Sequence, residues 1–314
     1  MSIQKGVFPI FLAGSILMSC TKPLDLPLDE ENSQELILSC FFTSDDFEAY
    51  LTKFRSILQP EAIPEEDAII ELWHQDQLMD TLSYQGSGRY RYTGSNLVSG
   101  ELYQLLVKTD YHEVQASAIL PPAKVEIDHA TYFFVESADG NEYIDINLHF
   151  FDPDSEKNYY EFVILHPFYD ELKDSTYLSY LHDIAIPDAV LNREGDLVYA
   201  PSSFVFSDEL INGGPYEMQL RFEHSSVSGN RWIKGKYRNN QSEYYLIFRT
   251  VSEDYYRFRK SWFRHRHNQS TDNQFDNELQ LLFGAEPFTL FSNVSNGFGI
   301  FAGYHEGIFP IHEQ

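Results

Sequence analysis

Cysteine is scarce in this chain of 314 residues, which contains only Cys20 and Cys40. A disulfide framework needs several cysteines, so this count excludes one, particularly because Cys20 has another role, described below. Cys40 lies in the apolar run from 35 to 43, which is typical of a buried strand. That run offers no electropositive neighbour, so we interpret Cys40 as a small buried hydrophobic residue and not as a reactive thiol.

Basic residues are also few. Lysine and arginine total 22 against 48 aspartates and glutamates, which gives a formal net charge of −26. A chain this acidic repels nucleic-acid phosphates and anionic membrane surfaces. We therefore expect no nucleic acid among its partners.

Familiar catalytic motifs are missing as well. The sequence has no Gly-x-Ser-x-Gly elbow, no His-Glu-x-x-His, no phosphate-binding loop and no dinucleotide fingerprint after a strand. Its many acidic residues permit a carboxylate pair of the glycosidase type, but no spacing points to one. We predict a non-enzymatic protein with no catalytic residue, no bound metal and no cofactor, and an unrecognised hydrolase remains an alternative hypothesis.

Hydrophobic runs long enough to span a bilayer, which takes about 20 residues, are absent too. The apolar run from Gly6 to Met18 follows Lys5 and precedes Ser19, a pattern that predicts a secretory signal peptide over residues 1–19. Leu17-Met18-Ser19-Cys20 resembles the lipobox of bacterial lipoproteins, in which the cysteine thiol is diacylated before cleavage. The alternative is an ordinary signal peptide that happens to contain a cysteine.

We expect Cys20 to become the lipid-modified N-terminus. Cleavage would remove one lysine and no acid, so the net charge would become −27. Two or more acyl chains anchor a protein stably where a single chain does not. Residues 20–34 mix proline with acids and predict an extended tether that holds the body off the membrane.

Residues 35–120 contain about six short strand-like runs separated by turn residues. One example is 85–94, where glycines precede alternating tyrosines as in a hairpin. This spacing predicts an immunoglobulin-like or transthyretin-like β-sandwich. For residues 65–78 a helix that begins at Pro64 is the alternative.

Pro121-Pro122 is the predicted domain boundary, because a diproline does not continue a strand ladder. Residues 123–314 predict a larger β-rich domain, with residues 167–203 as a looser, exposed excursion. The fold class is therefore mainly β, with one helix in the C-terminal region. Ser252 is the expected cap of that helix, and the apolar Tyr255, Phe258 and Trp262 would share one face.

Arg257 to His267 is the only basic cluster in this acidic sequence. One interpretation is that this cluster contacts phosphates, an acidic ligand or a partner. We favour the other interpretation, in which it pairs with the protein's own carboxylates. His265 and His267 are two apart, a poor spacing for metal ligands on a helix. The acidic run 152–156 lacks the remaining positions of a calcium loop, so we interpret it as a plain turn. We interpret Asn293, Asn296, Gly297 and Gly299 as a structural turn before a strand.

Several segments carry a resemblance to one family. They are Phe151–Tyr160, Phe206–Gly213, Ser252–Tyr256, Glu286–Tyr304 and Gly88-Arg-Tyr90. They resemble the domain-of-unknown-function 4249 family of Bacteroidota outer-membrane lipoproteins, often encoded beside TonB-dependent receptors. The resemblance covers nearly the whole chain after residue 20 and implies an all-β body of two parts. It implies no reaction and no catalytic residues.

The resemblance also implies a location and a partner. We expect a protein anchored to the outer membrane through Cys20, because Thr21 stands where an aspartate would signal retention at the inner membrane. We expect it at the cell surface and not the periplasmic face, because the acids at Asp25 and Asp29–Glu31 are compatible with surface export. A TonB-dependent receptor is the implied partner, with this protein as a non-enzymatic accessory that captures a ligand. A surface adhesion or structural protein is the alternative.

Overall fold

The computed structural model describes residues 35–54, 62–94, 97–122, 125–138, 140–154, 157–170, 175–181, 184–199, 201–223, 244–269 and 288–314. The predicted signal peptide, the tether and Cys20 lie outside the described residues. None of the helices in these ranges is long and apolar enough to cross a membrane.

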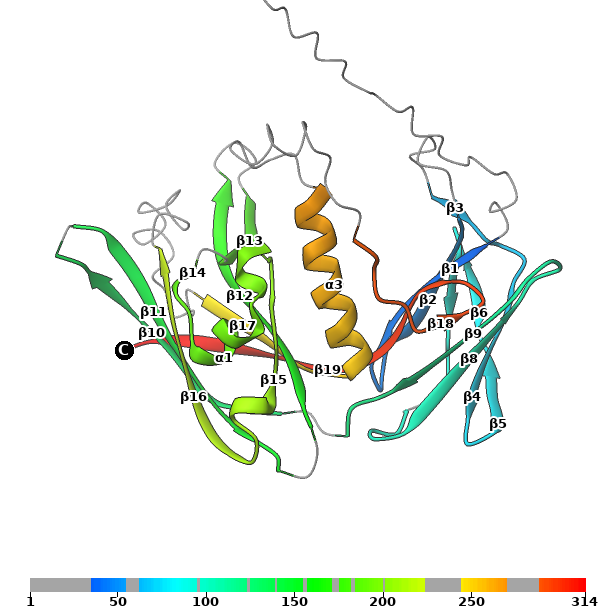
Figure 1. Cartoon of the computed structure of the whole chain (residues 1–314), viewed down its shortest axis with the longest axis horizontal. Coiled ribbons are helices and arrows are strands. Elements are labelled where there is room, and N and C mark those ends of the chain that lie inside the picture. Colours follow the sequence, from blue (N-terminus) through cyan, green and yellow to red (C-terminus); the bar gives the residue numbers. More distant parts are fainter. Residues whose placement is uncertain are drawn as a thin grey trace, which may run out of the picture.

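The N-terminal part is a β-sandwich, drawn in blue to cyan in Figure 1. Its strands are β1 (Leu36–Phe42), β2 (Phe47–Lys53), β3 (Ile63–Pro64), β4 (Ile69–His74), β5 (Gln77–Thr81), β6 (Ser83–Gly86), β7 (Arg89–Arg91), β8 (Leu102–Lys108) and β9 (Glu113–Ile119). One sheet holds β1, β2, β3, β6 and β7, and the other holds β4, β5, β8 and β9. The two sheets enclose one apolar core, which includes Leu38, Leu72 and Tyr103. Alternate side chains of β1 point into that core, as the pleat requires.

The C-terminal part is larger and is also mainly β. Its elements are β10 (Ile127–Glu136), β11 (Glu142–Asp152), β12 (Tyr159–Asp170), β13 (Ser175–Leu181), β14 (Ile184–Ile186), α1 (Ala189–Glu194), the 3₁₀ turns η2 (Asp196–Tyr199) and η3 (Asp208–Leu210), β15 (Phe204–Ser207), β16 (Gly214–Glu223), β17 (Tyr244–Val251), α3 (Glu253–Gln269), β18 (Val294–Ser295) and β19 (Phe298–Glu313). A second core lies between β10, β11 and β16 on one side and β12, β15 and β17 on the other. The mainly β prediction, with one helix in the C-terminal region, is confirmed.

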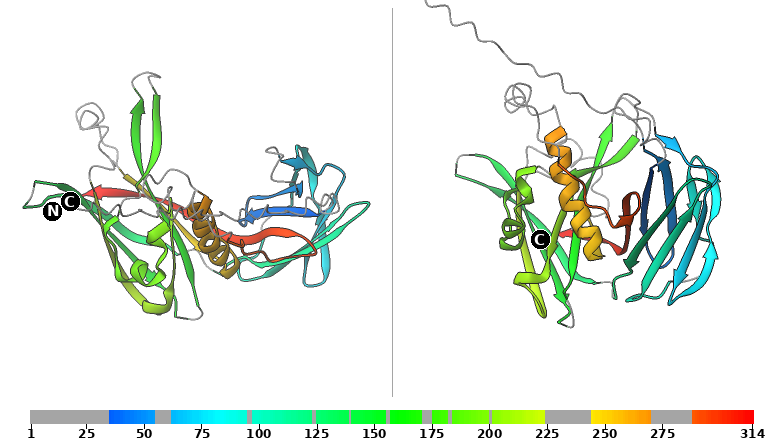
Figure 2. Two further views of the ribbon diagram at one scale, coloured as in Figure 1. Left: turned by 45° about the horizontal axis from the view of Figure 1, so that its top comes forward. Right: turned by 45° about the vertical axis from the view of Figure 1, so that its right-hand side comes forward.

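One long strand, β19, joins the two parts (Figures 1 and 2). Its first residues pair in parallel with β1, from Phe298 opposite Ile37 to Gly303 opposite Phe42. Its later residues pair with β17, and its last two pair with β10. The short strand β18 pairs with β9 in the other sheet of the sandwich. Residues 35–120 therefore do not make the sandwich alone, because residues 294–303 complete both of its sheets.

The turn that begins β19 depends on glycine. Asn296 has a φ of 59°, and Gly299 has a φ of +121°. A Cβ on Gly299 would overlap the carbonyl oxygen of Leu38 on β1, so only glycine lets the two strands come this close. The interpretation of this segment as a structural turn is confirmed.

The helical alternative for residues 65–78 is wrong. Ile70 and Leu72 on β4 are fully buried while Ile69 is exposed, the period of two that a strand produces. Pro64 lies in the edge strand β3 and pairs with Thr52 of β2. Pairing with neighbouring strands, and not the proline, therefore determines that this segment forms a strand instead of a helix.

The looser excursion predicted for residues 167–203 is wrong for the described part of that range, most of which lies in strands, a helix and a 3₁₀ turn. β12 and β13 form a hairpin, and the short helix α1 follows. Asp188 caps α1 by accepting a hydrogen bond from the amide of Val190 at 2.9 Å, and Gly195 ends it with a φ of 75°. Val190 is buried in the second core, which explains why the segment packs against the sheet.

Cys40 lies on β1 at 1% exposure and forms no disulfide. Burial raises the pKa of its thiol well above the usual value. The interpretation as a buried hydrophobic residue is confirmed.

Candidate functional site around helix α3

Helix α3 forms where the sequence predicts it. The hydroxyl of Ser252 accepts a hydrogen bond from the amide of Tyr255 at 3.3 Å, and Glu253 and Asp254 stand at the positive end of the helix dipole. The helix lies between the two parts of the molecule in Figure 1. Tyr255 packs in a small apolar cluster with Ile300 of β19, so the helix rests on the strand that joins both parts.

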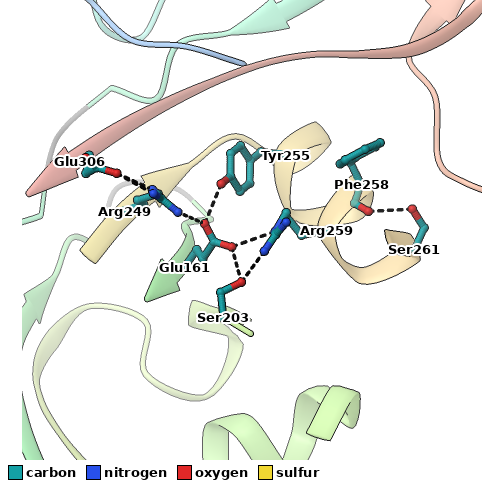
Figure 3. A network of polar contacts seen from close by, with 8 residues as sticks. All are labelled: Glu161, Ser203, Arg249, Tyr255, Phe258, Arg259, Ser261 and Glu306. Carbon is teal, nitrogen blue, oxygen red and sulfur yellow. Dashed lines mark hydrogen bonds and ion pairs between the residues drawn. The ribbon is translucent and has the colours of Figure 1, made fainter. Parts of the chain in front are cut away.

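A buried carboxylate, Glu161 of β12, lies beneath this helix (Figure 3). Its side chain is 0% exposed and accepts four hydrogen bonds. The donors are Arg249 Nη1 at 2.5 Å, Arg259 Nε at 2.8 Å, Ser203 Oγ at 2.6 Å and the Tyr255 hydroxyl at 2.6 Å. The network thus connects β12, β17, α3 and the residue before β15.

The charges in this network balance. Arg249 also donates to Glu306 of β19 at 2.7 Å, so two guanidinium groups face two carboxylates. Burial by itself would raise the pKa of Glu161, but Arg259 and Arg249 bring that pKa below its usual range. Burial and then the Glu161 charge raise the pKa of Tyr255, so its hydroxyl stays protonated and donates.

Glu161 is therefore an ionised carboxylate whose partners are all supplied by the protein. A general base or nucleophile must reach a substrate, and this group is enclosed and saturated. We assign the network a positioning role, in which it fixes α3 against three strands. Sequence patterns did not point to Glu161, because its partners come from positions between 42 and 98 residues away.

A second buried network lies further along α3. Glu194, at the end of α1, accepts hydrogen bonds from Lys260 at 2.6 Å and from the Tyr256 hydroxyl at 2.5 Å. Its other oxygen accepts from the amide of Ser207 at 2.8 Å. Burial would raise the pKa of Glu194, but Lys260 and Tyr256 lower it below the usual range. Asp196 lies 3.1 Å from Lys260, yet burial keeps its pKa raised.

The basic cluster Arg257 to His267 is partly explained by these contacts. Arg259 and Lys260 turn inward to buried carboxylates, as we favoured. Arg257 and Arg264 instead lie over the rings of Phe291 and Phe288, each 4.3 Å from the ring centroid, while both remain exposed.

The two histidines of the cluster have separate surroundings. His265 contacts the carbonyl oxygen of Phe288 at 3.0 Å, and the ring of His267 lies 5.5 Å from that of Tyr199. Within the described ranges, no three His, Cys, Asp or Glu side chains are placed to hold a metal ion.

The segments that carried the family resemblance meet in pairs. Asp152 is fully buried and accepts hydrogen bonds from the Tyr160 hydroxyl and, at 2.9 Å, from the amide of Gly213. Asn158 donates its amide to Asp208 at 2.6 Å. Segment 151–160 therefore packs directly on segment 206–213, and its first acid is internal. Residues 155 and 156 of the acidic run lie outside the described residues.

Asn293 joins the segments 252–256 and 286–304. Its side chain amide donates to Asp254 of α3 at 3.1 Å and to the carbonyl of Phe301 at 2.7 Å, and its oxygen accepts from the amide of Phe301 at 2.9 Å. The same amide group lies 3.1 Å from the carbonyl oxygen of Ser117 on β9. Asn293 thus ties helix α3 and β19 to the sandwich.

An open groove lies on the outer face of the C-terminal sheet. It has a volume of about 240 Å³ and crosses β10, β11, β16 and β14. Arg221 and Asp145 form a two-bond ion pair at 2.5 Å across the groove floor, with the amide side chains of Asn147 and Gln219 beside them. Phe133 supplies an apolar wall. Sequence patterns missed this groove, because its residues come from strands up to 88 positions apart.

The model of the family described as domain of unknown function DUF4249 matches residues 21–308. The chain belongs to this family. The matched range includes the paired segments described above. In the structure these segments contact one another within the fold. No curated protein matches the sequence.

Two solved structures show weak likeness. One is an α-L-rhamnosidase from Dictyoglumus thermophilum, with 10% identity and a TM-score of 0.28 over 70% of this chain and 27% of the rhamnosidase. The other is the collagen adhesin of S. aureus, with 7% identity and a TM-score of 0.20 over 89% and 97% of the two chains. This chain spans about a quarter of the rhamnosidase it matches. TM-scores this low carry no argument about fold or function.

Proposed function

We propose that this protein is a lipid-anchored, non-enzymatic binding protein of the outer membrane that acts beside a TonB-dependent receptor. The observation that carries the proposal is the sequence Leu17-Met18-Ser19-Cys20 at the end of a short apolar run, followed by 15 residues from 20 to 34 before the folded body. A diacylated cysteine would anchor the body stably and leave it extracytoplasmic.

The geometry of the body supports binding better than catalysis. The buried carboxylates Glu161 and Glu194 are held by arginine, lysine and tyrosine from the protein itself. The open groove instead presents groups that are suited to binding a ligand and not to catalysis. The amides of Asn147 and Gln219 each offer a donor and an acceptor, and Phe133 offers an apolar surface.

Acylation and partnership are tested separately. Mass spectrometry of the mature N-terminal peptide should find Cys20 as residue one with its acyl chains. Cys20→Ser should abolish acylation, and Cys40→Ala is the matched control that changes the other cysteine and keeps the lipobox. A mature chain with an unacylated Cys20 would remove the basis of the proposal.

Partnership is tested by gentle crosslinking in cells and purification from detergent-solubilised outer membranes. A TonB-dependent receptor should copurify with the wild type and with Cys40→Ala, but not with Cys20→Ser. If the acylated protein brings no receptor with it, the accessory role is wrong while the anchor stands.

A surface adhesion protein is the second candidate. Tyr180 on β13 is 52% exposed and Ile186 on β14 is 55% exposed, so the region 167–203 presents apolar side chains to solvent. Exposed aromatic side chains are common at protein and glycan contacts. Binding to a glycan or matrix-protein array that Tyr180→Ser weakens, without a copurifying receptor, would favour adhesion over the accessory role.

A further inference from the structure

One end of the sandwich exposes large apolar side chains at the place where the tether enters the body. Phe298 is 47% exposed, Ile63 is 40% exposed, and Phe54 and Tyr111 are each 37% exposed. We call these four residues the apolar tip. They come from four different segments, the start of β19, β3, the end of β2 and the turn between β8 and β9.

Strand register and side-chain contacts bring the four residues to the same end of the sandwich. Phe298 is opposite Ile37 on β1, and the amide of Phe54 donates to the carbonyl of Glu35 at 2.6 Å. The rings of Phe54 and Phe298 are 6.1 Å apart. Phe54 and Phe298 therefore lie next to the point where the described chain begins, and β1, β2 and β3 meet at this end in Figure 1.

Lys53 completes this end of the sandwich. It pairs with Ile63 across the strands, and its ammonium lies 5.3 Å from the centroid of the Tyr111 ring. Lys53 also forms an ion pair with Glu65 at 3.2 Å, and the Tyr111 hydroxyl donates to the same glutamate. The polar groups of Lys53 and Tyr111 are thus satisfied internally, while the ring of Tyr111 stays partly exposed.

We propose that the apolar tip docks onto the phospholipid surface in which Cys20 is anchored, and this inference rests on the proposed function. Fifteen residues span at most about 50 Å, so the anchor keeps the tip within reach of the bilayer. Aromatic rings favour the membrane interface, where one side is apolar and the other wet. Docking would hold the body in one orientation relative to the bilayer.

The charges around the tip indicate which lipid headgroups it can approach. Glu66, Asp110 and Glu113 are exposed at the same end. These acids would be repelled by anionic headgroups, so the surface that fits is zwitterionic. We expect phosphatidylcholine or phosphatidylethanolamine to support docking and phosphatidylglycerol to weaken it.

The test uses the full acylated protein reconstituted into phosphatidylcholine vesicles that contain brominated lipid. Phe298→Trp and, independently, Phe54→Trp place a fluorescent ring in the tip. Leu78→Trp is the matched control. Leu78 is 49% exposed and lies beside the turn that follows His74. His74 pairs with Tyr103 at the start of β8, whereas Tyr111 follows the end of β8. Leu78 therefore lies at the opposite end of the sandwich from Tyr111. The emission of the chain's own three tryptophans is subtracted.

Bromines near the headgroups should quench both tip tryptophans about two-fold, because an interfacial apolar group sits about 5–10 Å into the bilayer boundary. Leu78→Trp should keep its emission. Equal emission with and without bromine at both tip positions would overturn the inference, and so would equal quenching of Leu78→Trp. The intact mass of the same sample reports acylation, so a missing lipid at Cys20 refutes the proposed function and not the tip.

Discussion

Replacing Glu161 by glutamine should destabilise the protein strongly. All four groups around this carboxylate donate hydrogen bonds to it, so the amide nitrogen of glutamine, which only donates, would oppose the two guanidinium groups. Arg249 and Arg259 would also lose the buried charge that neutralises them. Removing one partner of a buried ion pair costs about 3–5 kcal/mol.

The cost translates into a measurable melting shift. At about 2–4 °C per kcal/mol for a unit of 150–250 residues, Tm should fall by about 6–20 °C. Thermal unfolding followed by near-ultraviolet circular dichroism measures this shift. Glu306→Gln is the matched control, because Glu306 binds the same Arg249 but is 33% exposed. An exposed pair contributes about 0–1 kcal/mol, so this control should melt close to the wild type.

The pH dependence gives the same network a second test. The pKa of Glu161 is lower in the folded protein than in the unfolded chain, where it is about 4.3. Its stabilisation is therefore complete above that unfolded value and is lost as the pH falls through the folded pKa. Glu161→Gln should show a shallower loss of stability below about pH 4 than the wild type. If Glu161→Gln melts like the wild type and keeps the same acid profile, the carboxylate does not hold helix α3 in place.

Two other substitutions probe the contacts between the parts of the molecule. Gly299→Ala should prevent β19 from pairing with β1, because its Cβ would overlap the Leu38 carbonyl, and limited proteolysis should show the loss of a protected body. Gly86→Ala, whose Cβ would meet nothing within 4 Å, should stay protected at a cost of about 1–2 kcal/mol. Lys260→Met leaves the buried Glu194 without its cation and should lower the free energy of unfolding by about 3–5 kcal/mol in urea. An unchanged urea midpoint would show that Glu194 does not need Lys260.

Local sequence patterns were sufficient for several parts of this fold. Ser252 followed by two acids and an apolar repeat predicted α3, because capping and dipole effects act within one turn. The glycines of segment 85–94 predicted the hairpin between β6 and β7, where Gly88 has a φ of 75°. The family was also evident from short segments, and the family model matches residues 21–308.

Long-range pairing was beyond those patterns. Asp188 and Gly195 could have indicated helix α1, since a cap and a terminating glycine flank a short apolar segment. No comparable local pattern predicts that Glu161 forms ion pairs with Arg249 and Arg259, because buried ion pairs depend on which elements become neighbours in the fold.

The sequence by itself determined the class of structure, the helix after Ser252 and the expectation of a lipid anchor at Cys20, because each depends on residues that are close together in the chain. The tertiary structure alone decided that β19 returns to pair with β1, that Glu161 is enclosed, and that Phe54 and Phe298 meet where the body begins. Parallel pairing and charge burial are settled by packing between distant segments, and local propensity carries no information about such partners.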